Sequence, residues 1–349
     1  MKTIVIIFIV GFAVLHEVLG LKKSLDALFY KGELDKELVE PDEEITLYQS
    51  VVNQSWMPML YINLMTALHE DAECLENEQW CKQHLYHSAM ETFCKYRMYL
   101  LGHRKWKDKV HFCMKKRGCY HFGHYYIEAG DIFGLKSEVR SADENHELVV
   151  MPATTDSEAV WKAYSGFIGD ISAQRFILED PVLTVGFREY TGHEPMKSIS
   201  FNQTAKMGKM YVKCYDYTTE LKVTILLNMY DGTAEELEHC LEIVRTVCQD
   251  LETRHISYAF ASNGDVAEYI APGLGDNHFN VLMKQMGKSN LNSYYSLESL
   301  LIRCEDKRYQ SRGFILVTPP LDEKNQALVQ RFNQKLDSEM CILTGGERE

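Results

Sequence analysis

The fold is decided by a short apolar stretch, KVTILLNMYDG at residues 222–232. Its first eight residues form an apolar run typical of a strand buried in a parallel sheet. Thr233 follows as a helix N-cap, and Glu235 and Glu236 come in the first helical turn, where carboxylates favour the helix dipole. The stretch therefore predicts a buried strand that leads into a helix.

The residues after this stretch alternate between helix and strand patterns. The helix has an apolar inner face made of Leu237, Leu241, Val244, Val247 and Leu251. Beyond it we predict strands at 256–261 and 266–271, split by a turn at 262–265, then helices at 279–286 and 295–302. A strand at 314–318, a helix at 327–336 and a last strand at 340–343 follow. Alternating strands and helices predict an α/β fold with a doubly wound, mostly parallel sheet.

This order of elements resembles the von Willebrand factor A-type domain over about residues 221–345. The resemblance rests on the order of elements, on KVTILLNMYDG as the first strand and its exit, and on RGFILVTPP at residues 312–320 as the fourth strand. The family would continue through another helix, strand and helix beyond Glu349, so we expect a truncated A-like domain at 221–349. An unrelated doubly wound fold is the alternative.

The resemblance also implies what has happened to the metal site of that family. The family often holds Mg²⁺ or Mn²⁺ through Asp-x-Ser-x-Ser, a later Thr and an Asp after the fourth strand. Those positions fall on Asn228, Tyr230 and Gly232, near Leu291, and on Pro319. Hard cations need oxygen ligands, several of them carboxylates, so we expect no working metal site and no cofactor.

A ligand edge is still expected at the carboxyl ends of the strands. Its candidate residues are Asn228, Tyr230, Asp231, Thr233, Ser293 and Pro319. Four of them, Asn228, Asp231, Thr233 and Ser293, are the set from which a weak metal site would have to form.

The amino-terminal part is predicted to be helical. Leu60, Leu64 and Leu68 recur every four residues, and residues 79–103 have a spacing nearer helical than strand period. Gly102, Gly118 and Gly123 are plausible helix stops. We therefore predict a small cysteine-rich helical domain at 46–135, after an acidic, solvated lead-in at 21–45. Residues 136–220 are a connecting segment, with candidate strands at 181–187 and 210–214 and a candidate helix at 160–167.

The first twenty residues have the features of a secretory signal peptide. Lys2 precedes an apolar run at residues 4–15, and Val18-Leu19-Gly20 forms a small-residue exit. Twelve apolar residues are too few to span a bilayer, which takes about 20, and no later apolar run approaches 18 residues. We therefore expect a secreted protein without a transmembrane segment.

Ten cysteines agree with an oxidising compartment, where disulfides are the default. Five lie early in the chain and five late: Cys74, Cys81, Cys94, Cys113, Cys119, and Cys214, Cys240, Cys248, Cys304, Cys341. Because five is odd, either one bridge joins the halves or each half keeps a free thiol. Asn53 and Asn202 head the triplets NQS and NQT, which are glycosylation sequons.

Charge is distributed unevenly. The net charge of −13 argues against general nucleic-acid binding, yet residues 95–117 hold nine basic residues against one acidic residue. An anion-binding patch would consist of Arg104, Lys105, Lys107, Lys109, Lys115, Lys116 and Arg117. Sulfated glycans and anionic membranes are its candidate partners, and a solvated helix face balanced by acidic runs is the alternative.

Six histidines leave a zinc protein or enzyme as a further alternative: His84, His87, His103, His111, His121 and His124. The two pairs His84-x-x-His87 and His121-x-x-His124 lie beside Cys81, Cys113 and Cys119. No Cys-x-x-Cys, His-Glu-x-x-His, Gly-x-Ser-x-Gly or phosphate-loop motif is present. The leading expectation is a secreted, non-catalytic protein that binds an extracellular protein or glycan. A purely structural extracellular protein is the third alternative.

Overall fold

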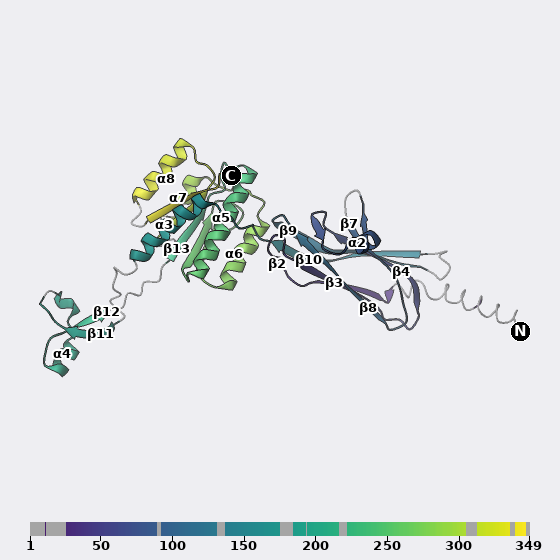
Figure 1. The fold of residues 1–349 in the computed structure, drawn as a ribbon, viewed down its shortest axis with the longest axis horizontal. Coiled ribbons are helices and arrows are strands. Elements are labelled where there is room, and N and C mark those ends of the chain that lie inside the picture. Colours follow the sequence, from purple (N-terminus) through teal and green to yellow (C-terminus); the bar gives the residue numbers. More distant parts are fainter. Residues whose placement is uncertain are drawn as a thin grey trace. The chain divides into compact units, whose positions relative to one another are not determined.

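The computed structural model describes residues 26–88, 92–130, 137–174, 184–192, 194–215, 222–304, 313–335 and 339–346, together with Gly11. The chain divides into two compact units, Met1–Ala153 and Thr154–Glu349 (Figure 1). Apart from Gly11, the predicted signal peptide lies outside the described residues. Among the helices that are described, none has the length and apolar character needed to cross a membrane.

The first unit is built from two sheets. One has four strands in the order β1 (Leu28–Leu34), β3 (Ile45–Asn53), β8 (Lys105–Met114) and β5 (Ala72–Cys74). The other has six, in the order β2 (Leu38–Val39), β10 (Ser137–Val150), β9 (Gly118–Gly130), β4 (Met59–Leu68), β7 (Thr92–Leu100) and β6 (Leu85–His87). All pairings are antiparallel except that of β2 with β10. One short helix, α2 (Glu78–His84), precedes β6.

Both sheets contribute to a single apolar core. Leu47, Val51 and Phe112 come from the four-stranded sheet, and Leu64 and Ile127 from the six-stranded one, and each is at most 2% exposed. The two sheets therefore form a sandwich in which alternate residues of each strand point inward.

The helical domain predicted for residues 46–135 is wrong. Leu64 and Leu68 lie in strand β4, where Ile62 and Leu64 are fully buried and Leu60 is 45% exposed. A spacing of four residues fits a strand as well as a helix, since every second residue of a strand shares one face. An irregular register between Met59 and Ile62 turns Leu60 outward.

The expected helix stops and the polar segments also have other roles. Gly118 begins β9, and Gly123, with φ of 116°, lies where the register of β9 and β10 shifts. The acidic lead-in contains β1 and β2, whose Leu28, Tyr30 and Val39 are buried. Buried and exposed residues alternate along β1, where Phe29, Lys31 and Glu33 are exposed, a strand pattern that average polarity conceals. The start of the connecting segment, residues 137–150, is strand β10.

The second unit holds a five-stranded sheet in the order β15 (Ile270–Gly273), β14 (Ser257–Ser262), β13 (Lys222–Leu227), β16 (Gly313–Thr318) and β17 (Glu339–Thr344). The pairs β14–β13, β13–β16 and β16–β17 are parallel, and β15 is an antiparallel edge strand. A separate pair, β11 (Thr184–Glu189) and β12 (Tyr211–Tyr215), accompanies the 3-10 helix η1 (Met196–Ser198) and α4 (Phe201–Met207).

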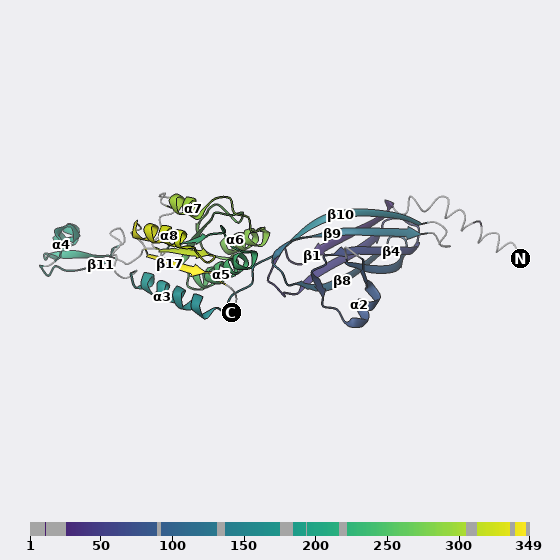
Figure 2. The same ribbon diagram turned by 90° about the horizontal axis from the view of Figure 1, so that it is seen from above.

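Helices cover both faces of the five-stranded sheet. On one face, Leu226, Phe314 and Leu316 share a core with α7 (Leu297–Cys304) and α8 (Glu323–Lys335). On the other face, α5 (Ala234–Thr253) contacts β13, β14 and β16, while α3 (Glu158–Gln174) contacts β17. Helix α6 (Asp276–Lys288) contacts α5. Figure 2 shows α7 and α8 on one side of β17 and α3 on the other.

The protein is thus a mixed α/β protein, and the element predictions after residue 220 are confirmed in type. Thr233 caps α5 through a complete capping box with Glu236, and the predicted inner face of α5 is buried from Leu237 to Leu251. The third strand is displaced: β15 begins at Ile270, four residues later than predicted. The helix predicted at 160–167 lies within α3.

Candidate functional site

At the predicted ligand edge, the strand ends are joined by a buried network of side-chain hydrogen bonds. Asn228 follows β13, is 2% exposed, and donates from Nδ2 to Thr318 Oγ1 over 2.9 Å. Its Oδ1 accepts from Asn263 Nδ2 at 2.8 Å, and Asn263 Oδ1 accepts the Met229 N–H at 2.7 Å. The amides thus satisfy one another and tie together the carboxyl ends of β13, β14 and β16.

The other predicted edge residues do not join this network through their side chains. Tyr230 is 39% exposed, Asp231 is exposed with φ of 59°, and Thr233 is used as the cap of α5. Pro319 is buried, and Ser293 is exposed and forms an isolated bridge with Gly264. The edge is therefore a surface of separate groups around a satisfied interior.

Sequence reasoning missed four polar residues at this edge: Asn263, Asp265, Ser289 and Thr318. Asp265 accepts from the Ser289 hydroxyl and from the Asn290 N–H, the latter at 2.8 Å. Asn263 and Thr318 lie just after, or at the end of, a strand of the sheet. Their position at strand ends was the available signal, since parallel strands bring such residues to one edge.

The second unit also has a hollow of about 620 Å³ near the start of α3. Trp161 and Phe279 line it together with Asp250, Glu252 and Asp276. Two of these carboxylates already have structural roles. Asp250 accepts from the Tyr164 hydroxyl at 2.7 Å, and Glu252 accepts from the Gly275 N–H at 2.8 Å.

Three of the seven basic patch residues lie on strand β8, and the other four lie in the segments that flank it, so the solvated helix face is not what the structure contains. Lys105, Lys107 and Lys109 alternate along β8, and all three are exposed. In register, Lys109 is opposite Tyr48 and Lys107 is opposite Ser50. Because alternate strand residues share one face, these three side chains form what we call the lysine row. Arg104, also exposed, directly precedes it.

The remaining predicted patch residues differ from the lysine row because each has a partner of its own. Lys115 pairs with Glu73 at 2.5 Å and Lys116 with Asp71 at 2.7 Å. Each hydrogen-bonded carboxylate raises the pKa of its lysine. Within the described parts of the chain, the lysine row forms no ion pair with a carboxylate. Arg117 is half-buried and engaged in a contact of its own.

Most of the six histidines have partners unrelated to a metal. His84 stacks on Trp80 with ring centroids 4.7 Å apart, and His111 pairs with Glu44 at 2.7 Å. His87 Nδ1 lies 3.0 Å from Thr92 Oγ1, and the ring of His124 contacts Tyr126. His103 is exposed in a turn, with φ of 55°. His121 lies beside Cys119 and Glu147.

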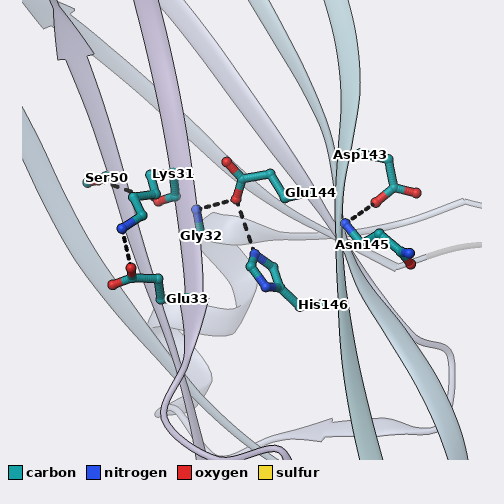
Figure 3. A network of polar contacts seen from close by, with 8 residues as sticks. All are labelled: Lys31, Gly32, Glu33, Ser50, Asp143, Glu144, Asn145 and His146. Carbon is teal, nitrogen blue, oxygen red and sulfur yellow. Dashed lines mark hydrogen bonds and ion pairs between the residues drawn. The ribbon is translucent and has the colours of Figure 1, made fainter.

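An acidic hollow of about 410 Å³ lies near β1 and β10 of the first unit. It is lined by Glu33, Leu34, Asp35, Glu37, Tyr48, His146 and Glu147. Figure 3 shows Glu144 reaching from β10 to β1: its Oε2 accepts the Gly32 N–H at 2.7 Å and lies 3.3 Å from His146 Nε2. Asn145, with φ of 48°, occupies the register shift beside it.

The two sequons differ in accessibility. Asn53 is fully buried, and its Nδ2 donates to the carbonyls of Met57, Leu100 and Leu101. A glycan on that nitrogen would displace these bonds, so the folded structure disfavours glycosylation at Asn53. Asn202 is exposed on α4.

The cysteines are divided equally between the two units, and the structure places one pair close together. Cys74 and Cys81 have their sulfur atoms 3.8 Å apart. Cys240 and Cys248 are both fully buried on α5. They are eight residues apart, which is about 12 Å along the helix axis, so they cannot form a disulfide with each other. Burial raises the pKa of Cys240 to about 12.

We predict a disulfide between Cys74 and Cys81, which would close a loop of about eight residues and stabilise the fold by about 2–3 kcal/mol. Peptide mapping without reductant should recover the two cysteines in one linked pair, and replacing both by Ala should lower the unfolding free energy by that amount. Cys214→Ala is the control. Linkage of either cysteine to Cys94 would contradict the assignment.

Comparison with known proteins adds no family. No family model matches the chain, and no curated protein matches it. The major pilin subunit BcpA of Bacillus cereus shares 7% identity over 36% of this chain and 41% of its own, with a TM-score of 0.26. AvmM, which catalyses macrocyclization in alchivemycin A biosynthesis, shares 11% over 37% of this chain and 92% of its own, with a TM-score of 0.24. A CARDB domain from Pyrococcus furiosus, in complex with metal ions, shares 11% over 36% of this chain and 90% of its own, with a TM-score of 0.20.

Proposed function

We propose that this chain is a secreted, non-catalytic binding protein that recognises a sulfated glycan through the lysine row of its first unit. One observation carries the proposal. Lys105, Lys107 and Lys109 are aligned on the exposed face of β8 and pair with no carboxylate of the described chain, in a protein of net charge −13.

The geometry of the lysine row favours a linear polyanion. Alternate residues of a strand are separated by about 6.8 Å, so the row extends about 13.6 Å. A sulfated chain carries repeated charges along one direction and can meet several lysines at once. Tyr48 on the neighbouring strand β3 is opposite Lys109, is 51% exposed and supplies flat apolar surface beside the row. Phe29, 47% exposed, lies one strand further away on β1. The local field, more than the net charge, steers such an encounter.

We further propose that the second unit is a divergent A-type domain that acts without a metal. The succession from β13 through α5, the β14–β15 pair, α6, α7, β16 and α8 to β17 supports this view. At the edge where the family binds its ion, the buried amides of Asn228 and Asn263 hydrogen-bond to each other instead. Any partner of this edge would meet exposed groups such as Tyr230, Asp231 and Ser293.

A paired comparison of lysine substitutions tests the glycan proposal. The variant Lys105→Ala/Lys107→Ala should bind heparin about 30-fold more weakly than the wild type. The estimate assumes about 1 kcal/mol for each lysine near a highly anionic surface. Elution salt on a heparin column and titration with a heparin oligosaccharide both measure it.

The control variant is Lys115→Ala/Lys116→Ala, which removes the same charge from lysines already paired with Glu73 and Asp71. It should bind heparin nearly as the wild type does. Equal losses in both variants would mean that only net charge matters. Binding to anionic lipid vesicles with no retention on heparin would identify a membrane surface, and not a glycan, as the ligand of the lysine row.

A further inference from the structure

We propose that Cys119, His121 and Glu147 form a binding site for a zinc ion on the outer face of the six-stranded sheet. This site is separate from the lysine row and goes beyond the proposed glycan binding. Among the residues that the structure describes, these three form the group of His, Cys and acidic side chains whose ligand atoms converge: the candidate atoms all lie within 4.8 Å of one another.

The strand register brings the three side chains together. Cys119 and His121 are two residues apart on β9, so they share one face. Their neighbours Tyr120 and Phe122 are buried on the opposite, core face. Glu147 of β10 is directly opposite His121, and the register shift between Asp143 and His146 ends just before it. The convergence therefore depends on the β9–β10 pairing, which a helical interpretation of residues 119–124 cannot produce.

The three groups match the ligand chemistry of zinc. A thiolate, an imidazole and a carboxylate bind zinc at about 2.3, 2.0–2.1 and 2.0–2.2 Å. In a tetrahedral site these bond lengths separate ligand atoms by about 3.4 Å. The observed limit of 4.8 Å is about 1.4 Å larger, and rotation of three side chains on a sheet surface can close that difference. Three protein ligands would leave one position for water or a small anion, as in open zinc sites.

The surroundings favour a cation. Glu147 also lines the acidic hollow of about 410 Å³ together with Glu33, Asp35 and Glu37. Carboxylates around a recess lower the electrostatic energy of a bound cation. His146, although adjacent in sequence, is directed to Glu144 in Figure 3 and is not part of the group.

The cysteine count of the first unit agrees with a thiolate ligand. Five cysteines cannot all pair within one unit, and Cys74 and Cys81 are the two whose sulfur atoms approach. Cys94 and Cys113 are 0% and 4% exposed, whereas Cys119 is only half-buried. Of these last three, Cys119 is the one that an ion from solvent reaches most directly.

Titration of the full-length, metal-depleted protein with zinc alone tests the site, with a chromophoric chelator as competitor. We expect one equivalent to bind, and Cys119→Ser, His121→Ala and Glu147→Gln each to weaken affinity at least 100-fold. Loss of an outer-shell partner already costs 10–100-fold, and a direct ligand should cost more. His121 is exposed, so its replacement leaves the core intact and separates loss of the site from loss of folding.

Cobalt substitution supplies a second measurement. The cobalt-loaded wild type should show a thiolate-to-metal charge-transfer band that Cys119→Ser abolishes. The matched control is His124→Ala, on the same strand beyond Gly123, which should leave zinc affinity unchanged. The proposal is overturned if no stoichiometric zinc binds, if His124→Ala weakens binding as much as His121→Ala, or if peptide mapping finds Cys119 in a disulfide.

Discussion

Replacing Asn228 by Ala should lower the unfolding free energy of the second unit by about 3 kcal/mol. The substitution removes the acceptor of Asn263 Nδ2 and of the Tyr230 N–H, and the donor to Thr318 Oγ1. Each buried polar group left without a partner costs about 1–3 kcal/mol. Because Asn263 and Thr318 are fully buried, water cannot readily replace the lost bonds. Native-state hydrogen exchange of β13 and β16 amides measures the effect.

The matched control for this prediction is Asn290→Ala. The Asn290 residue is exposed, and its bond to Asp265 uses the backbone N–H, which alanine retains. Its replacement should change the unfolding free energy by less than about 0.5 kcal/mol. A loss below 1 kcal/mol for Asn228→Ala would show that the amide network does not hold the strand ends together.

Replacing Phe112 by Ala should lower the unfolding free energy of the first unit by about 3–5 kcal/mol, the usual cost of a large-to-small change in a core. Phe112 is fully buried on β8, and its ring lies 5.2 Å from that of Phe122 across the sandwich. The cavity would open between the two sheets, so the whole sandwich should lose stability. Hydrogen exchange of β3, β4 and β9 amides reports it.

Tyr99→Ala serves as the comparison, since Tyr99 lies on β7 of the same unit and is 68% exposed. It should change the unfolding free energy by less than about 0.5 kcal/mol. The pair also tests the fold itself. If residues 105–114 were an amphipathic helix with a solvated basic face, the cross-strand NMR contact between Phe112 and Ile45 would be absent.

The second unit could be predicted to a large extent because its buried strands are continuous apolar runs. KVTILL and GFILVT are buried along almost their whole length, and such runs have one interpretation when capped helices follow them. The edge strand β15 was misplaced by four residues because it is short and half-exposed. Its burial follows from its place beside β14, not from its own sequence.

The first unit was predicted wrongly because its apolar spacing is ambiguous. Positions 60, 64 and 68 fit the same face of a helix, but every even position from 62 to 68 is buried in β4, Thr66 among them. The polar Thr66 interrupts the apolar series; its hydroxyl donates to Gln49 across the core at 2.6 Å. A polar residue satisfied from another sheet cannot be recognised from local periodicity.

By itself, the sequence determined the α/β character of residues 222–344 and the cap at Thr233. Only the tertiary structure decided which polar residues meet: the amides of Asn228 and Asn263, the three aligned lysines of the lysine row, and the group of Cys119, His121 and Glu147. The physical reason is that strand pairing joins residues distant in sequence. A shift of one residue in register sends a side chain to the opposite face.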